Sequence, residues 1–153
     1  MKIMDIVVQE AVLLELAPGD KREVLAQLAR ALAASVPELE AERLLQVLLD
    51  RESLQSTGIG EGVAIPHGKF PGLDRLLAAF ARSTPGTDFE AVDGQPTHLF
   101  FLLVVPEHSG GQHLKALARI SRFFRDASFR KRLMEATSVE EVFQAIGEED
   151  AKF

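Results

Sequence analysis

The sequence predicts a layered domain of the α/β or α+β class, with helices packed on a central sheet. Two segments with helical spacing of apolar residues, 21–34 and 40–51, come before the strand-like segments. Residues 97–105 (THLFFLLVV) are apolar at almost every position, which is typical of a central strand buried on both faces. Further helical segments follow from residue 112, so helices are available to cover the sheet.

The composition fits a single domain over residues 1–153. Hydrophobic residues make up 46% of the chain, which is enough for a core that needs no covalent or metal staple. The absence of cysteine excludes disulfides, thiolate metal sites and cysteine nucleophiles, and it is compatible with a reducing compartment.

Charge and hydropathy argue against two further classes of protein. The 23 acidic and 17 basic residues give a net charge of −6, so a globally basic nucleic-acid-binding protein is not expected. No run of 18 apolar residues is present, so no membrane insertion is expected. The N-terminal residues are interrupted by Asp5 and Glu10 and do not resemble a signal peptide. We therefore expect a soluble, cytoplasmic protein.

The first part of the chain predicts a lead-in segment and two helices. Residues 3–16 are expected to be extended or briefly helical before a Pro-Gly pair. Asp20, with Glu23 three residues later, forms a capping-box pattern that starts the helix over 21–34. Leucines at helical spacing then predict the second helix over 40–51.

A glycine-rich loop and a short strand follow. Gly58, Gly60 and Gly62 alternate within residues 53–62, and a helix tolerates such spacing poorly. We interpret this segment as a loop that approaches another group closely. Residues 63–65 are expected to form a short buried strand, which a proline ends.

The middle of the chain predicts further strands. The apolar run over residues 75–82 has the length of a strand, and residues 87–92 are a weaker candidate. An Asp-Gly turn signal separates them from the strand over 97–105. Helices are then predicted over 112–125 and 129–136.

The end of the chain predicts one more helix. Ser138 and Glu141 form a second capping box, which opens a helix that continues to Ile146. Gly147 is expected to end this helix. Residues 148–153 are then expected to form a flexible acidic tail.

Three common catalytic motifs are not matched. Residues 62–69 superficially suggest a phosphate-binding loop, but His67 stands where its second glycine belongs and Phe70 where Ser or Thr would hold magnesium. The glycine spacing differs from the dinucleotide-binding fingerprint, and no G-x-S-x-G elbow occurs. NTPase, dehydrogenase and serine hydrolase functions are therefore not favoured.

Two of the four histidines occupy positions where open α/β sheets bind ligands. His67 comes just after the short strand, and His113 lies in the first turn of the helix predicted after the strongest strand. Histidine can exchange protons or accept a phosphoryl group near neutral pH. The partial positive charge at a helix start suits an anion and disfavours a charged His113. The alternative is a packed or surface role for both histidines.

The other candidate residues are His98, His108 and Arg51. His98 lies inside a strand and is expected to be structural, and His108 lies in a polar loop and is expected to be solvated. A metal site built from these two, His113 and Glu107 matches no familiar ligand spacing, so no metal site is predicted. Arg51 ends the second predicted helix, where its guanidinium either neutralises a phosphoryl group or stabilises the helix C-terminus.

Several segments together resemble a known family, the EIIA domains of the phosphotransferase system (PTS) of the mannitol/fructose type. The segments that carry this resemblance are 49–52 (LDRE), 56–69 (STGIGEGVAIPHGK), 91–96 (AVDGQP), 102–106 (LLVVP) and 113–118 (HLKALA). The combination of A-I-P-H with the later H-L-x-x-L-A is specific, and the resemblance covers nearly the whole chain. The I-P-H-G-K form and the length look most like the nitrogen-regulatory EIIA branch.

The resemblance implies a mixed sheet of about five strands flanked by helices on both faces. It also implies that His67 accepts a phosphoryl group on a ring nitrogen, from the phosphocarrier protein HPr or its nitrogen-branch counterpart. His113 matches the second active-site histidine of the family, and Arg51 matches its active-site arginine. Because the donor is itself a phosphorylated protein, no nucleotide, metal or other cofactor is expected.

Two further expectations concern the surroundings of His67. Thr57 and the glycines at 58, 60 and 62 are expected to let backbone N–H groups close on the phosphoryl oxygens. Phe70, Pro71 and Leu73 follow the histidine and either form an apolar rim for the donor or belong to the core.

Three functions stay open at this point. The predicted function is a phosphocarrier whose phosphorylation state controls partner proteins. The alternatives are a sugar-transport EIIA that passes the group to a cysteine on a separate EIIB, and a binding module that never carries phosphate.

Overall fold

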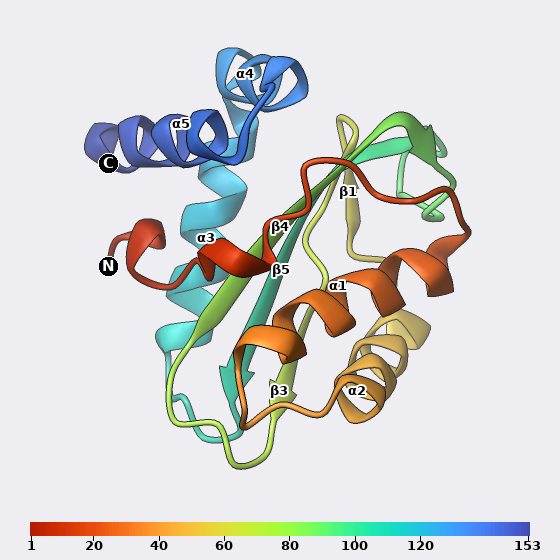
Figure 1. The fold of residues 1–153 in the computed structure, drawn as a ribbon, viewed down its shortest axis with the longest axis vertical. Helices are drawn as coiled ribbons and strands as arrows, with labels where there is room; N and C mark the ends of the chain where they lie inside the picture. Colours follow the sequence, from red (N-terminus) through yellow and green to blue (C-terminus); the bar gives the residue numbers. More distant parts are fainter.

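The structure is a computed structural model that describes residues 1–153. Helices cover both faces of a five-stranded mixed sheet, as the sequence predicts (Figure 1). The helices are α1 (Lys21–Ser35), α2 (Ala41–Leu54), α3 (Gln112–Arg125), α4 (Ala127–Glu135) and α5 (Val139–Lys152), preceded by the short 3-10 helices η1 (Ile3–Asp5) and η2 (Gln9–Ala11). The strands are β1 (Gly58–Gly60), β2 (Val63–Ala64), β3 (His67–Phe70), β4 (Leu77–Thr87) and β5 (Thr97–Pro106). None of the helices has the length and apolar character needed to cross a bilayer.

Strand β5 is the centre of the sheet, which confirms the prediction made from its apolar run. It pairs with β4 in antiparallel orientation and with β2 and β3 in parallel orientation. Because β2 pairs with the start of β5 and β3 with its end, these two short strands follow one another along the same side of β5. Strand β1 adds to β2 in antiparallel orientation.

Two hydrophobic cores lie on the two faces of this sheet. Alternate residues of β5 point to opposite faces, so Phe100 and Leu102 join one core while Phe101 and Leu103 join the other. Helices α1 and α2 close the first core, and α3, α4 and α5 close the second (Figure 1).

The lead-in segment and the predicted caps are confirmed. Residues 3–16 contain η1 and η2 and run along β4, where the amide of Val8 donates to the Ala78 carbonyl at 2.8 Å. The carboxylate of Asp20 accepts from the amide of Glu23 at 2.9 Å and starts α1. The hydroxyl of Ser138 accepts from the amide of Glu141 at 3.2 Å and starts α5.

One prediction about strands is wrong, and one strand was not predicted. Residues 87–92 form no separate strand, because β4 extends to Thr87 and the chain then turns through Glu90 with a φ of 55°. The strand that was not predicted is β3, and His67 is its first residue, opposite Leu103 of β5. A four-residue strand that contains a glycine carries little local signal, and its pairing with β5 is what orders it.

The expected flexible tail is also wrong, because α5 continues through Gly147 to Lys152. Asp150 is buried, and its carboxylate accepts from the amides of Ile3 at 3.0 Å and Met4 at 2.9 Å. The same carboxylate pairs with Arg119 of α3 at 3.0 Å. These partners lie more than 30 residues away in the sequence, so the local pattern after Gly147 could not reveal them.

We expect the Asp150→Ala variant to lower the free energy of unfolding by about 3 kcal/mol, since it leaves Arg119 partly buried without its partner and two amides without an acceptor. Urea unfolding followed by circular dichroism measures this loss. The matched control is Glu135→Ala, which removes an exposed carboxylate of α4 that makes no ion pair and should stay within about 0.5 kcal/mol of the parent protein. Equal effects of the two substitutions would contradict the role assigned to Asp150.

Candidate functional site

A pocket of about 430 Å³ lies between α2 and α3, beside the edge strand β3. It brings together Arg51, His67 and His113, which the sequence places 16 to 62 residues apart. The apolar residues that line it are Val47, Leu54, Leu103, Val105 and Leu117, and Asp50, Gly68 and Lys69 complete the lining. The pocket therefore combines apolar walls with a few converging polar groups, as ligand-binding sites commonly do.

The imidazole of His67 has one nitrogen tied to the backbone. Its Nδ1 lies 2.8 Å from the carbonyl oxygen of Ile65. Because a carbonyl oxygen can only accept a hydrogen bond, Nδ1 carries the proton and Nε2 keeps its lone pair. No hydrogen-bond partner holds Nε2, so this atom is free to react with a group that enters the pocket.

The surroundings of His67 favour the neutral imidazole. Burial lowers the pKa of His67 below its usual 6.5, and the positive charge of Arg51 and the nearby His113 add to this effect. The hydrogen bond to Ile65 and the negative charge of Glu52 act in the opposite direction, but they are outweighed. At neutral pH the ring therefore presents an unprotonated Nε2.

Arg51 both caps the end of α2 and lines the pocket, so its geometry is compatible with either of the alternatives that the sequence left open. Its Nη1 donates to the carbonyl of Gln55 at 2.9 Å, which satisfies a backbone acceptor where α2 ends. Its other guanidinium nitrogens make no hydrogen bond within the protein, and the side chain lines the pocket. One end of the guanidinium is thus anchored while the rest stays available to an anion.

His113 lies in the first turn of α3, as predicted. Its Nδ1 is 3.1 Å from the hydroxyl oxygen of Ser109 and 3.2 Å from the carbonyl of Gly110. The Gly110 carbonyl can only accept, so Nδ1 donates here as it does in His67 and Nε2 is left free. That His113 is neutral stays a prediction.

The glycine loop does not line this pocket. Gly60 and Gly62 have φ angles of 95° and 75° and form the turn between β1 and β2, for which glycine is well suited. Gly58 lies against Ala91, where a Cβ would come within 2.9 Å. The alternating glycines therefore serve a tight hairpin, and the expected contact of their N–H groups with a phosphoryl group in this pocket has no support in the geometry.

Thr57 and Glu52 form a buried anchor next to Arg51 that the sequence analysis missed. The carboxylate of Glu52 is 4% exposed and lies 2.9 Å from Nζ of Lys21 in α1. It also accepts from the Thr57 amide at 3.1 Å and from the Thr57 hydroxyl. This anchor fixes the chain where it leaves α2, one residue after Arg51. Lys21 and Glu52 are 31 residues apart, so no spacing pattern could have paired them.

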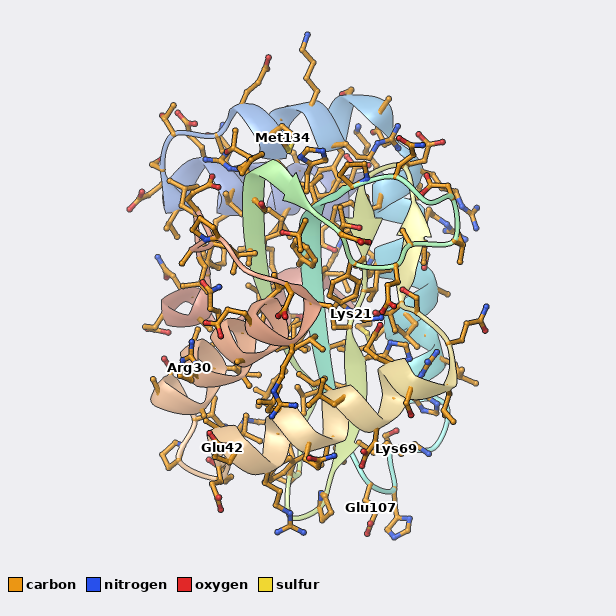
Figure 2. The ribbon with its side chains drawn as sticks, turned by 90° about the vertical axis from the view of Figure 1, so that its right-hand side faces the viewer. Lys21, Arg30, Glu42, Lys69, Glu107 and Met134 are labelled. Atoms are coloured by element: carbon orange, nitrogen blue, oxygen red, sulfur yellow. The ribbon has the colours of Figure 1, made fainter.

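Gly68 and Lys69 are two more residues of the site that were not predicted. A Cβ on Gly68 would lie 2.5 Å from Cγ1 of Val47, so only glycine lets α2 approach β3 this closely. Lys69 is exposed, lines the pocket beside α2 (Figure 2) and adds a second cation next to Arg51.

The open question about an apolar rim is answered in favour of the core. Phe70 and Leu73 are both buried in the core closed by α1 and α2. The exposed apolar side chains near the pocket are instead Leu54, which lines it and is 80% exposed, and Leu114, which follows His113 and is 62% exposed.

The two other histidines lie outside this pocket. The ring of His98 packs against the carbonyls of Ser83 at 3.1 Å and Thr84 at 3.2 Å, in agreement with a structural role. His108 is exposed and lies 3.5 Å from Glu107.

A mixed α/β sheet that presents two histidines and an arginine in one pocket fits the class of phosphoryl-carrier proteins. The sequence profile of the family "Phosphoenolpyruvate-dependent sugar phosphotransferase system, EIIA 2" matches residues 5–149. The chain belongs to this family, and it is therefore an EIIA component of the PTS.

Relatives within the family include nitrogen regulatory proteins and a fructose-specific component of the PTS. The chain is 43% identical over 146 residues to a nitrogen regulatory protein of Bradyrhizobium diazoefficiens, with 95% of each chain covered. It is 38% identical over 128 residues to a nitrogen regulatory protein of Pseudomonas aeruginosa, covering 84% of this chain and 83% of the relative. It is also 35% identical over 150 residues to the fructose-specific EIIABC component of Bacillus subtilis, covering 98% of this chain and 24% of that longer protein.

Solved structures support the same family and fold. The nitrogen regulatory protein IIA-Ntr of Neisseria meningitidis superposes with a TM-score of 0.87 at 35% identity, covering 94% of this chain and 98% of the other. The mannitol IIA of Escherichia coli superposes with a TM-score of 0.74 at 23% identity, covering 91% and 97%, which shows a shared fold.

We expect the titration of His67, followed by ¹H–¹⁵N NMR, to have its midpoint below 6.5, with the proton of the neutral ring on Nδ1. The Arg51→Gln variant should raise this midpoint, because it removes a nearby positive charge. The matched control Arg22→Gln, at an exposed arginine of α1, should leave the midpoint unchanged. A midpoint above 6.5, or no response to Arg51→Gln, would refute this account.

The lowered pKa of His67 also predicts how stability depends on pH. As the pH falls through 6.5, the unfolded chain takes up a proton on this histidine before the folded chain does. The free energy of unfolding should therefore decrease over that range, and the His67→Gln variant should show a smaller decrease in urea titrations at a series of pH values.

Proposed function

We propose that Nε2 of His67 accepts a phosphoryl group from an HPr-like phosphocarrier protein. The observation that carries this proposal is the free Nε2 of a neutral imidazole in a pocket that also holds Arg51 and His113. Membership of the EIIA family supports the same chemistry.

The transfer is an in-line displacement between two imidazoles. The lone pair of Nε2 attacks the phosphorus of the donor's phosphohistidine, a new N–P bond forms, and the N–P bond to the donor breaks with its electron pair leaving on the donor ring. The transition state is loose, so the protein contributes position and electrostatics more than covalent chemistry. The hydrogen bond from Nδ1 to Ile65 holds the ring in one orientation throughout.

Three groups of the pocket are placed to stabilise the transferred phosphoryl group. The free nitrogens of Arg51 and the ammonium of Lys69 balance charge on the equatorial oxygens. His113 is the second imidazole of the site, and its Nε2, which has no partner within the protein, donates a hydrogen bond to a phosphoryl oxygen once it is protonated. No nucleotide, metal or other cofactor takes part in this scheme.

We further propose that the phosphorylation state of His67 controls partner proteins, as in a nitrogen-regulatory EIIA. The similarity to the nitrogen regulatory proteins of Bradyrhizobium diazoefficiens and Pseudomonas aeruginosa over most of their lengths supports this branch. The second candidate is transfer to the cysteine of a separate EIIB, which the similarity to a fructose-specific EIIABC component supports.

The acceptor residue is tested by reconstitution with phosphoenolpyruvate labelled with ³²P, Enzyme I and HPr. The parent protein should take up one acid-labile phosphoryl group, and the His67→Ala variant should take up none while it stays folded by circular dichroism. The control is His108→Ala, since this exposed ring lies outside the pocket and its loss should leave labelling unchanged. Full labelling of His67→Ala would disprove the assignment of this residue.

The supporting residues are tested by the rate of the same reaction. The His113→Ala and Arg51→Gln variants should still be labelled to completion, but on the order of 100-fold more slowly, as expected when one group that stabilises a transition state is removed. Rapid-quench measurement of the first turnover gives the rate. An unchanged rate in His113→Ala would assign this histidine to packing.

Addition of a purified EIIB to the labelled protein distinguishes the two branches. Regulation predicts that label stays on His67 and that binding of partner proteins differs between the two phosphorylation states. Rapid transfer of label to an EIIB cysteine would instead favour sugar transport, and failure of any histidine to accept label would leave a binding module.

A further inference from the structure

A second hollow, of about 520 Å³, lies at the opposite end of α3 from His113. It is bounded by the β1–β2 hairpin, the last turn of α3 and one arginine of α4. Ile59 and Phe124 contribute apolar surface, and Glu61, Arg125 and Arg130 contribute charge. The hollow shares no lining residue with the His67 pocket, so the proposed phosphoryl transfer does not account for it.

The charge around this hollow is opposite to that of the whole chain. The protein has a net charge of −6, but residues 112–134 hold seven of its 17 basic residues and one of its 23 acidic residues. Helix α3 itself contains four basic side chains and no acidic one. Of these basic residues, Arg125 and Arg130 line the hollow, whereas Arg119 pairs with Asp150 and Arg132 with Glu148, so Arg125 and Arg130 are the charges that attract an anion to it.

The two arginines of the hollow differ in how they are held. Arg125 is exposed and makes no ion pair or hydrogen bond within the protein. Arg130 is 20% exposed and its Nη1 donates to the carbonyl of Phe124 at 2.6 Å, which fixes the guanidinium at the end of α3. One guanidinium is therefore positioned in advance and the other is free to close on a ligand.

We propose that this hollow binds a small organic phosphate, with its phosphate dianion between Arg125 and Arg130 and its organic part on Ile59. Guanidinium groups bind phosphate oxygens in bidentate fashion, and two of them match the charge of a phosphomonoester. Ile59 is 46% exposed although it is apolar, so it offers surface that a ligand can cover. The concave shape favours a small molecule over a flat protein surface. This inference is independent of the function proposed for His67.

Glu61 acts as an internal competitor for the same site. Its carboxylate lies 3.8 Å from Nη2 of Arg130 but is 78% exposed, so the pair is loose. A phosphate that reaches Arg130 must displace this carboxylate. Removal of the Glu61 charge should consequently strengthen binding, an effect in the opposite direction from that of any arginine substitution.

The experiment is an NMR titration of the full chain with phenyl phosphate as the probe, observed at the arginine side-chain N–H signals. The signals of Arg125 and Arg130 should shift saturably. Affinity should fall about tenfold in Arg125→Ala, which loses one charged contact, and rise in Glu61→Gln. The matched control Arg22→Ala, at an exposed arginine of α1 without an ion pair, should bind like the parent protein.

Four results would overturn the proposal. These are the absence of a saturable shift at the two arginines, an equal loss of affinity in Arg22→Ala, equal affinity for inorganic phosphate and phenyl phosphate, and binding of an Asp/Glu-rich peptide where phenyl phosphate does not bind. The third result would show that the organic part of the ligand contributes no affinity. The fourth result would show that the hollow binds an acidic protein partner and not a small phosphate. Because no phosphoryl transfer is measured, these outcomes stand apart from those of the His67 labelling experiment.

Discussion

The hydrogen bond from Nδ1 of His67 to the carbonyl of Ile65 is the interaction on which the site depends. It selects the tautomer in which Nε2 keeps its lone pair, and it prevents the ring from turning away from the pocket. The bond forms because Pro66 separates two short strands, β2 and β3, that both lie parallel to β5. Nε2 is therefore oriented by a backbone carbonyl that lies between two strands of the sheet.

Helix α2 completes the His67 pocket, because direct contacts hold it in place beside β3. Glu52 anchors the chain after α2 through Lys21 and Thr57, and the missing side chain of Gly68 lets α2 lie close to β3. Arg51 then reaches the pocket while one of its nitrogens satisfies the carbonyl of Gln55. Burial lowers the pKa of His67 and the positive charge of Arg51 adds to this effect, so the charge that would stabilise a phosphoryl group also favours the neutral imidazole.

The sequence predicted the main residues of the His67 pocket better than the strand and the long-range contacts that hold them in place. The helices, the central strand and the convergence of His67, His113 and Arg51 followed from periodicity, caps and a specific family resemblance. Strand β3 was missed because it is ordered by pairing with β5, and the helical end of the chain was missed because its stabilising partners are distant in sequence. The alternating glycines pointed to a close approach, but the groups approached are Ala91, Asp93 and His98 of the same chain and not a ligand.

The contacts of Asp150 make the chain nearly a closed ring. Nζ of Lys2 donates to the Asp150 carbonyl at 3.0 Å, so the first and last turns of the molecule touch. A short linker would be enough to join residues 1 and 153, and a new opening could be cut at an exposed turn such as Asp93–Gly94. The arrangement of the helices and strands in space therefore does not require their present order along the chain. A circular permutant should keep the same fold.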